Sequence, residues 1–69
     1  MNKKMELEID SPVGSLYAQI NRRTGIYKHG IVVYDHKVKT ATATYLTDAE
    51  LIQLRDFLIE ATKEVANGL

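Results

Sequence analysis

The sequence predicts an α+β domain, in which a four-stranded antiparallel β-meander is followed by one C-terminal α-helix packed on one face of the sheet. Two observations support this class. In three of the four predicted strands, apolar residues alternate with polar ones, which is the period of a strand with one buried face, and the remaining strand is centred on a short apolar run. From residue 47 onward, apolar residues instead recur every three or four positions, as in an amphipathic helix. With 69 residues, the chain has room for a single domain, residues 1–69.

Short reversals separate the four predicted strands, and this favours antiparallel pairing of consecutive strands. The first reversal, at 11–14, has Ser, Pro and Gly at the positions they prefer in a type I turn. The centre of the third strand is apolar on both sides, so both faces of the sheet should be at least partly covered. The strands are expected at about 4–10, 15–21, 26–34 and 38–46, with the later reversals at 21–25 and 35–37.

The predicted helix begins at a recognisable start signal. Thr47-Asp48-Ala49-Glu50 has the spacing of a capping box, in which the Thr47 hydroxyl and the Glu50 carboxylate each bond a backbone N–H. Asn67-Gly68 is a fitting C-terminal stop. A broad apolar arc should pack on the sheet, and Tyr45 is expected to lie beneath it. The arc consists of Leu51, Leu54, Phe57, Leu58, Ala61 and Val65.

A second apolar stripe on the helix predicts self-association. Ile52, Ile59 and Ala66 recur at seven-residue spacing and are separated from the main arc by Arg55 and Thr62. A chain of this length buries only about 60% of the surface that its unfolded form exposes, and without Cys no disulfide can compensate. We therefore expect a homo-oligomer, most simply a dimer, with this stripe at the interface. One alternative is that the arc is simply wide; another is pairing through an exposed edge strand.

The charges are balanced overall but polarised along the chain. Nine basic and nine acidic residues give a net charge of zero, yet residues 1–46 carry an excess of positive charge and residues 47–69 an equal excess of negative charge. The basic residues around the reversals suggest a rim that binds a phosphate-bearing or carboxylate ligand, unless they point separately into water. The predicted ligand-binding residues are Arg22, Arg23, Lys28, His29 and Lys39, together with Tyr17 and Tyr27.

Several classes of function have no support in the sequence. We find no Cys, nucleophile elbow, glycine-rich phosphate loop or spaced carboxylate pair, so we predict no enzymatic activity and no cofactor. His29, Asp35 and His36 lack a known ligand spacing, so we predict no metal site. The longest apolar runs are too short to span a membrane, no signal peptide is evident, and the protein is predicted to be cytoplasmic.

The leading functional hypothesis is therefore a small non-enzymatic, oligomeric binding module. Its size, neutrality and lack of catalytic motifs are typical of phage-encoded accessory proteins that bind a host protein or sequester a small anionic ligand. Its partner would be a protein or a small anion.

The alternative comes from a resemblance at the junction of the last strand and the helix. A threonine-containing strand runs into Leu46-Thr47-Asp48-Ala49-Glu50-Leu51, and with the ββββα order this resembles the positive-cofactor-four family of single-stranded-DNA-binding coactivators over about residues 38–58. The resemblance implies dimerisation through the helix and nucleic-acid binding on the sheet. It would assign Arg22, Arg23, Lys28, Lys39 and Tyr27 to the nucleic-acid surface, although the chain lacks that family's strongly basic character.

Overall fold

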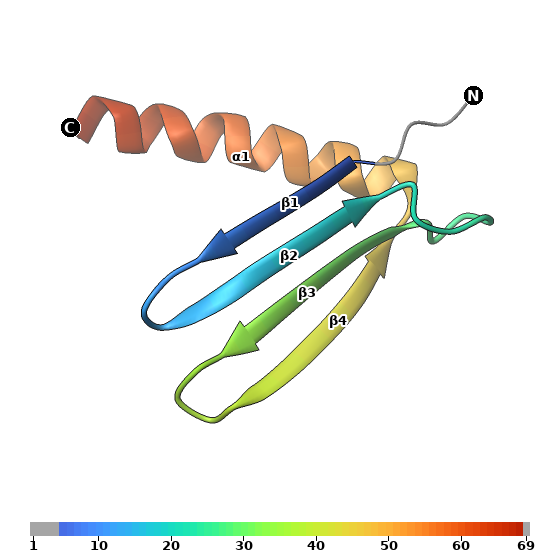
Figure 1. Ribbon diagram of the computed structural model, residues 1–69. Helices are drawn as coiled ribbons and strands as arrows, with labels where there is room; N and C mark the ends of the chain where they lie inside the picture. Colours follow the sequence, from blue (N-terminus) through green and yellow to red (C-terminus); the bar gives the residue numbers. More distant parts are fainter. Residues whose placement is uncertain (1–4, 69) are drawn as a thin grey trace.

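Four antiparallel strands and one helix follow each other in the predicted order (Figure 1). The computed structural model describes residues 5–68. The predicted α+β class is confirmed, with a single open sheet in the order β1-β2-β3-β4, so that β1 and β4 are its edges. The elements are β1 (Met5–Asp10), β2 (Gly14–Ile20), β3 (His29–Asp35), β4 (Thr40–Leu46) and α1 (Asp48–Gly68).

The strand register gives the sheet two chemically different faces. Leu7 pairs with Ala18, Ala18 with Ile31 and Ile31 with Thr44, so these four residues share one face. We call it the helix-side face, because His29, which lies on it, bonds Asp48 at the start of α1. It also holds Met5, Ile9, Leu16, Ile20, Val33, Thr42 and Leu46. The opposite, open face holds Glu6, Glu8, Asp10, Ser15, Tyr17, Gln19, Gly30, Val32, Tyr34, Ala41, Ala43 and Tyr45.

The third strand begins at His29, so the predicted start at residue 26 is wrong. Residues 21–28 form a loop that is closed where the Arg22 N–H donates to the Lys28 carbonyl at 2.9 Å. Asn21 and Gly25 have positive φ angles of 60° and 96°, a left-handed conformation that takes the chain out of the extended region. The pattern of apolar residues in 26–28 gave no sign of this closure.

The fourth strand begins at Thr40 rather than at residue 38, because the preceding reversal is longer than predicted. The Asp35 carboxylate accepts the N–H groups of Lys37 and Val38 at 2.8 and 3.3 Å. Lys39 has a φ of 59° and donates its N–H to the Asp35 carbonyl at 2.8 Å. Local bonding by an Asp side chain competes with strand pairing in this way, and it assigns Val38 and Lys39 to the turn.

The first hairpin turns where the sequence places it. Ser11 both donates to and accepts from Gly14, through its hydroxyl and backbone, and β1 then pairs with β2 from Asp10 opposite Ser15. Residue 4, the predicted start of the first strand, lies outside the described residues.

The predicted capping box is present at the start of α1. The Thr47 N–H donates to the Glu50 carboxylate at 2.9 Å, and the Glu50 N–H donates to the Thr47 hydroxyl at 3.2 Å. These reciprocal bonds satisfy two backbone donors that the helix itself leaves free. Within the described residues, α1 is not apolar enough along its length to traverse a lipid bilayer.

The helix covers little of the sheet, which corrects the expectation of a buried apolar arc. It approaches the strands most closely beside the end of β4, and only an open groove lies between it and the adjacent ends of β1 and β2 (Figure 1). Leu51 and Leu54 are half-buried, whereas Phe57 is 65% exposed and Val65 is 63% exposed. No apolar side chain between residues 5 and 68 is fully buried.

Tyr45 does not lie beneath the helix, so that expectation is also wrong. It pairs with Gly30 on the open face, one residue out of phase with Leu46 and His29 on the helix-side face. Tyr45 shares a face with Ala41 and Ala43, as their alternation predicts, but this is the open face and not the face toward the helix.

Replacing the capping hydroxyl should weaken the fold. Thr47→Ala removes the acceptor for the Glu50 N–H, and we expect the free energy of unfolding to fall by about 1 kcal/mol. Thr24→Ala, in the exposed loop, is the matched control and should change it by less than about 0.5 kcal/mol. Urea unfolding of both variants at one protein concentration measures this; equal effects would contradict a role for the cap.

Candidate functional site

Two arginines from the 21–28 loop lie against one tyrosine ring on the open face. The guanidinium carbon of Arg22 is 5.6 Å from the centroid of the Tyr45 ring, and that of Arg23 is 4.8 Å from it. Arg22 also donates from Nη1 to the Tyr45 hydroxyl at 3.2 Å. We call Arg22, Arg23 and Tyr45 the arginine corner.

Gly30 makes this corner sterically feasible. A Cβ at this position would lie 3.2 Å from Cδ of Arg22 and 3.2 Å from Cε1 of Tyr45, closer than such atoms normally pack. The absence of a side chain on β3 therefore lets Arg22 cross the strand beside the ring. Sequence reasoning missed this position. A signal was present, since a glycine inside an otherwise apolar strand often marks the close approach of another group.

The arginine corner carries uncompensated positive charge. Among the described residues, neither Arg22 nor Arg23 has a carboxylate within ion-pair distance, since the pairs found there involve other cations. Each guanidinium presents a planar set of N–H donors that matches a phosphate or carboxylate. The ring of Tyr45 holds both groups by cation–π attraction and so limits their freedom before a ligand arrives. An anion bound between them would also relieve their mutual repulsion.

Lys28 and His29, two further residues of the predicted rim, are engaged with the helix instead. Nζ of Lys28 lies 3.4 Å from the Asp48 carboxylate. His29 is 2% exposed; its Nδ1 accepts the Asn21 N–H at 3.2 Å and its Nε2 lies 2.6 Å from Oδ1 of Asp48. Because Nδ1 accepts, the ring proton is assigned to Nε2, which donates to the carboxylate. His29 thereby joins the loop to the start of α1.

The other predicted ligand residues are dispersed. Lys39 follows β3, at the opposite end of that strand from His29, a separation of roughly 20 Å for seven extended residues. Tyr27 is 53% exposed in the 21–28 loop, and Tyr17 lies in the middle of β2 on the open face. Within one chain, then, Arg22 and Arg23 come together, Lys28 and His29 turn to Asp48, and Lys39 stands apart.

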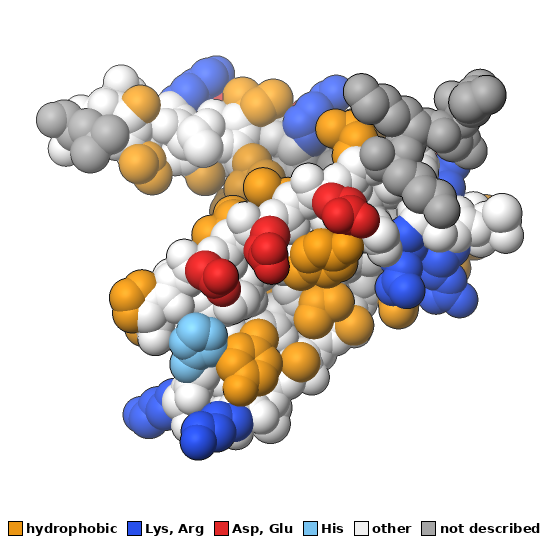
Figure 2. Space-filling view, in the orientation of Figure 1, with side chains coloured by type: hydrophobic (Ala, Val, Ile, Leu, Met, Phe, Trp, Pro, Cys, Tyr) orange, Lys and Arg blue, Asp and Glu red, His pale blue; other side chains and the backbone are white. Residues whose placement is uncertain are grey.

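The open face is acidic along one edge. Figure 2 shows a row of acidic side chains along β1, beside apolar and aromatic groups on the neighbouring strands. The row consists of Glu6, Glu8 and Asp10, and Glu6 accepts a hydrogen bond from Gln19 at 2.8 Å. Partial burial, and then the negative charge of Glu6, raise the pKa of the Tyr17 phenol above its usual value. A polyanion lying across the whole face would therefore meet repulsion at β1.

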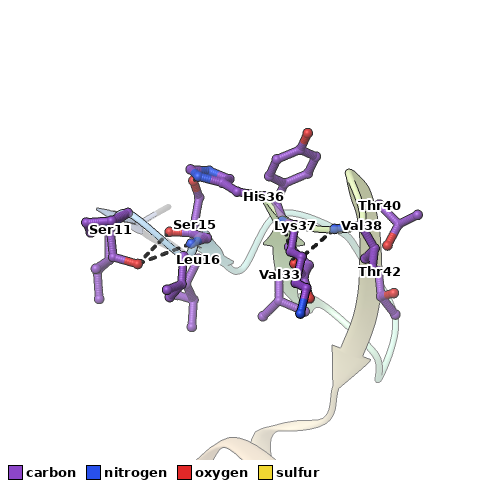
Figure 3. A pocket seen from close by; sticks show the side chains of 15 residues that line it. Ser11, Ser15, Leu16, Val33, His36, Lys37, Val38, Thr40 and Thr42 are labelled. Atoms are coloured by element: carbon purple, nitrogen blue, oxygen red, sulfur yellow. Dashed lines mark hydrogen bonds between the residues drawn. The ribbon is translucent and has the colours of Figure 1, made fainter.

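A second polar cluster forms where two turns meet at the far end of the sheet (Figure 3). The Ser15 hydroxyl donates to Asp10 at 2.6 Å and lies 3.4 Å from Nε2 of His36, whose ring contacts Tyr34 edge-on at 5.2 Å. The sequence separates Ser15 from His36, so the cluster was missed. It could have been found from the meander itself, because both turns lie at the same end of the sheet.

The cluster does not have the arrangement of an activated nucleophile. The single hydroxyl proton of Ser15 is directed to Asp10, so His36 can only donate to the oxygen and is not placed to remove a proton from it. The surrounding hollow is open, lined by both hairpin turns and the adjacent strand ends. No group of three or more His, Asp or Glu side chains among residues 5–68 is arranged to hold a metal ion.

Comparison with known proteins gives no relative for this arrangement. No family model matches the chain, and neither the curated proteins nor the solved structures include a significant match. The resemblance to the positive-cofactor-four family remains a prediction based on the strand-to-helix junction.

The link between loop and helix should make stability depend on pH. The hydrogen bond from His29, helped by Lys28, lowers the pKa of the Asp48 carboxyl. A lowered pKa stabilises the fold above the unfolded-state value of about 3.9, and this contribution is lost as the pH falls through the folded-state pKa. Asp48→Asn keeps an oxygen acceptor but removes the charge, so it should destabilise the protein at pH 7 and progressively less below about pH 4.

Urea unfolding between neutral and acidic pH, at one protein concentration, measures this difference. Asp56→Asn is the matched control, because Asp56 pairs only with its neighbour Arg55 on the exposed surface of α1. Its effect should be small throughout. A destabilisation by Asp48→Asn that stays constant across the whole range would show that its charge is not the cause.

Proposed function

We propose that the protein is a non-enzymatic binding module that takes a small phosphate- or carboxylate-bearing ligand at the arginine corner. The observation that carries this proposal is the convergence of Arg22 and Arg23 on Tyr45, without a carboxylate partner among the described residues. An acidic side chain or phosphate presented by a partner protein is the same chemistry and would be bound in the same way.

The local structure favours recognition over a merely solvated pair of arginines. The bond from Arg22 to the Tyr45 hydroxyl and the closure of the loop at Lys28 fix the base of the corner before binding. His29 anchors the same loop from below through the Asn21 N–H. Pre-organisation of this kind reduces the entropy that binding must otherwise overcome.

The absence of catalysis is part of the proposal and rests on chemistry. The hydroxyl of Ser15 is committed to Asp10, and the arginine corner offers hydrogen-bond donors and positive charge without an adjacent general base. Such a set binds an anion without offering a route to transform it.

Single-stranded nucleic acid is the second candidate, favoured by three tyrosines on one face. Tyr17, Tyr34 and Tyr45 lie on successive strands of the open face, where bases could stack while phosphates reach the arginines. The acidic row on β1 opposes a long polyanion on that face, whereas a small ligand at the corner avoids it. We therefore rank the small anion first.

Removing the two guanidinium groups should abolish most anion binding. With pyrophosphate as the probe in calorimetry at low salt, we expect Arg22→Ala plus Arg23→Ala to weaken binding by roughly 10- to 100-fold, as lost charged hydrogen bonds of about 1.5–3 kcal/mol imply. Lys37→Ala removes a positive charge from the distant turn after β3 and should leave pyrophosphate binding nearly unchanged. Equal losses in both variants, or no binding by the unaltered protein, would overturn the proposal.

A thymidine oligonucleotide in the same assay separates the two candidates. If the small-anion proposal is right, Tyr34→Ala leaves pyrophosphate binding intact and the oligonucleotide binds no more tightly than pyrophosphate. Tight oligonucleotide binding that falls steeply with salt and is lost in Tyr34→Ala would instead establish the nucleic-acid function.

A further inference from the structure

The helix-side face of the sheet is apolar and largely uncovered. Leu7 is 52% exposed, Ile9 is 50% exposed and Val33 is 47% exposed. Between its ends the face carries no ionisable side chain, and at one end both ring nitrogens of His29 already have partners. Removing a surface of this composition from water lowers the free energy of the molecule.

The helix presents a matching surface that its own sheet does not use. Phe57, Leu58 and Val65 project from α1 and remain largely exposed. Between the helix and the end of the sheet where β1 begins and β2 ends lies an open apolar groove of about 530 Å³, lined by Met5 and Ile20 on the sheet. Its helical wall is formed by Leu51, Ile52, Leu54, Arg55, Leu58, Ile59 and Thr62.

The polar members of this wall are compatible with burial. The Thr62 hydroxyl donates to the carbonyls of Leu58 and Ile59 at 2.7 and 3.1 Å, so it needs no external partner. The Arg55 guanidinium bonds the Asp56 carboxylate at 2.8 Å, which leaves its aliphatic stem for the groove. Neither residue therefore prevents an apolar partner from closing the groove.

A single chain exposes far more surface than a stable monomer of its size. Its accessible surface is 5794 Å², whereas a folded monomer of 7.8 kDa exposes about 4,400 Å². Its Cα radius of gyration is 13.8 Å, against about 11 Å for a compact domain of 69 residues. The excess area, roughly 1,400 Å² per chain, exceeds the roughly 800 Å² that each partner gives to a standard interface and suits an obligate dimer.

We propose that a second copy of this chain covers the helix-side face, with α1 of each copy lying on the sheet of the other. Each chain exposes both an apolar sheet face that its own helix does not cover and an apolar helix surface that its own sheet does not cover. A twofold arrangement buries both surfaces at once. Ile52 and Ile59, from the predicted interface stripe, line the groove that the partner closes. Ala66 lies further along the same stripe.

This arrangement leaves the proposed ligand surface free. Tyr45 and its two arginines lie on the open face, on the other side of the sheet from the groove. The dimer therefore does not depend on the binding function, and it carries two arginine corners facing outward.

The test is the mass and the thermal stability of the full chain. Sedimentation equilibrium at micromolar concentration should give twice the 7.8 kDa of one chain, and the melting temperature should rise with protein concentration. Leu58→Glu, in the helical wall of the groove, should lower the melting temperature and yield single chains or unfolded protein. Gln53→Glu places the same charge on the polar flank of α1 and should leave the mass doubled.

Three results would overturn the proposal. The first is a folded single chain whose melting temperature is independent of concentration. The second is a dimer whose mass and stability are unaffected by Leu58→Glu. The third is a dimer in which hydrogen exchange shows protection of the free edge of β4 and none of the α1 groove, because this pattern would place the contact along β4.

Discussion

One buried histidine links the arginine-bearing loop to the helix. His29 is the only side chain among the described residues that is fully withdrawn from water, and each of its ring nitrogens bonds a different segment. Through Asn21 it holds the loop that carries both arginines, and through Asp48 it holds the first turn of the helix. The position of the arginine corner on one face and of the helix on the other thus depends on one imidazole.

The two faces of the sheet differ because strand alternation sorts the residues so consistently. The apolar side chains of β1 and most of those of β2 and β3 fall on the helix-side face, while the acids of β1 and the tyrosines of the strands fall on the other. The helix leaves the sheet beside β4 and does not cover the four strands. The same geometry therefore creates a surface suited to another copy of the chain and a separate polar surface suited to a ligand.

Much of the fold was predictable because it follows from local signals. Alternation predicted β1, β2 and β4, an apolar run predicted β3, and the spacing of Thr47 and Glu50 predicted the helix start, as their reciprocal bonds confirm. Strand starts were less predictable where side chains and left-handed residues extend a turn, as at Asp35 and Lys39. The face occupied by Tyr45 could not be read from alternation, which separates two faces without saying which one the helix meets.

The candidate site was predictable only in part for the same kind of reason. Arg22 and Arg23 were identified by charge and loop position, but their platform, Tyr45, depends on cross-strand register and on the glycine opposite it. His29 was predicted to bind a ligand from its residue type and its position near a loop. The sequence does not indicate that the side chain is buried and already bonded to Asn21 and Asp48. Lys39 was grouped with the arginines because both lie near reversals, yet consecutive reversals of a meander occupy opposite ends of the sheet.

In the proposed dimer, one face of the sheet is covered by a second chain while the other stays open. A soluble paramagnetic agent added to methyl-labelled protein compares the two faces directly, using Leu7 and Ile9 on the helix-side face and Ala41 and Ala43 on the open face. All four are exposed in a single chain. We predict that the agent broadens the alanine methyl signals and spares those of Leu7 and Ile9. Equal broadening on both faces would contradict the burial of the helix-side face by a second chain.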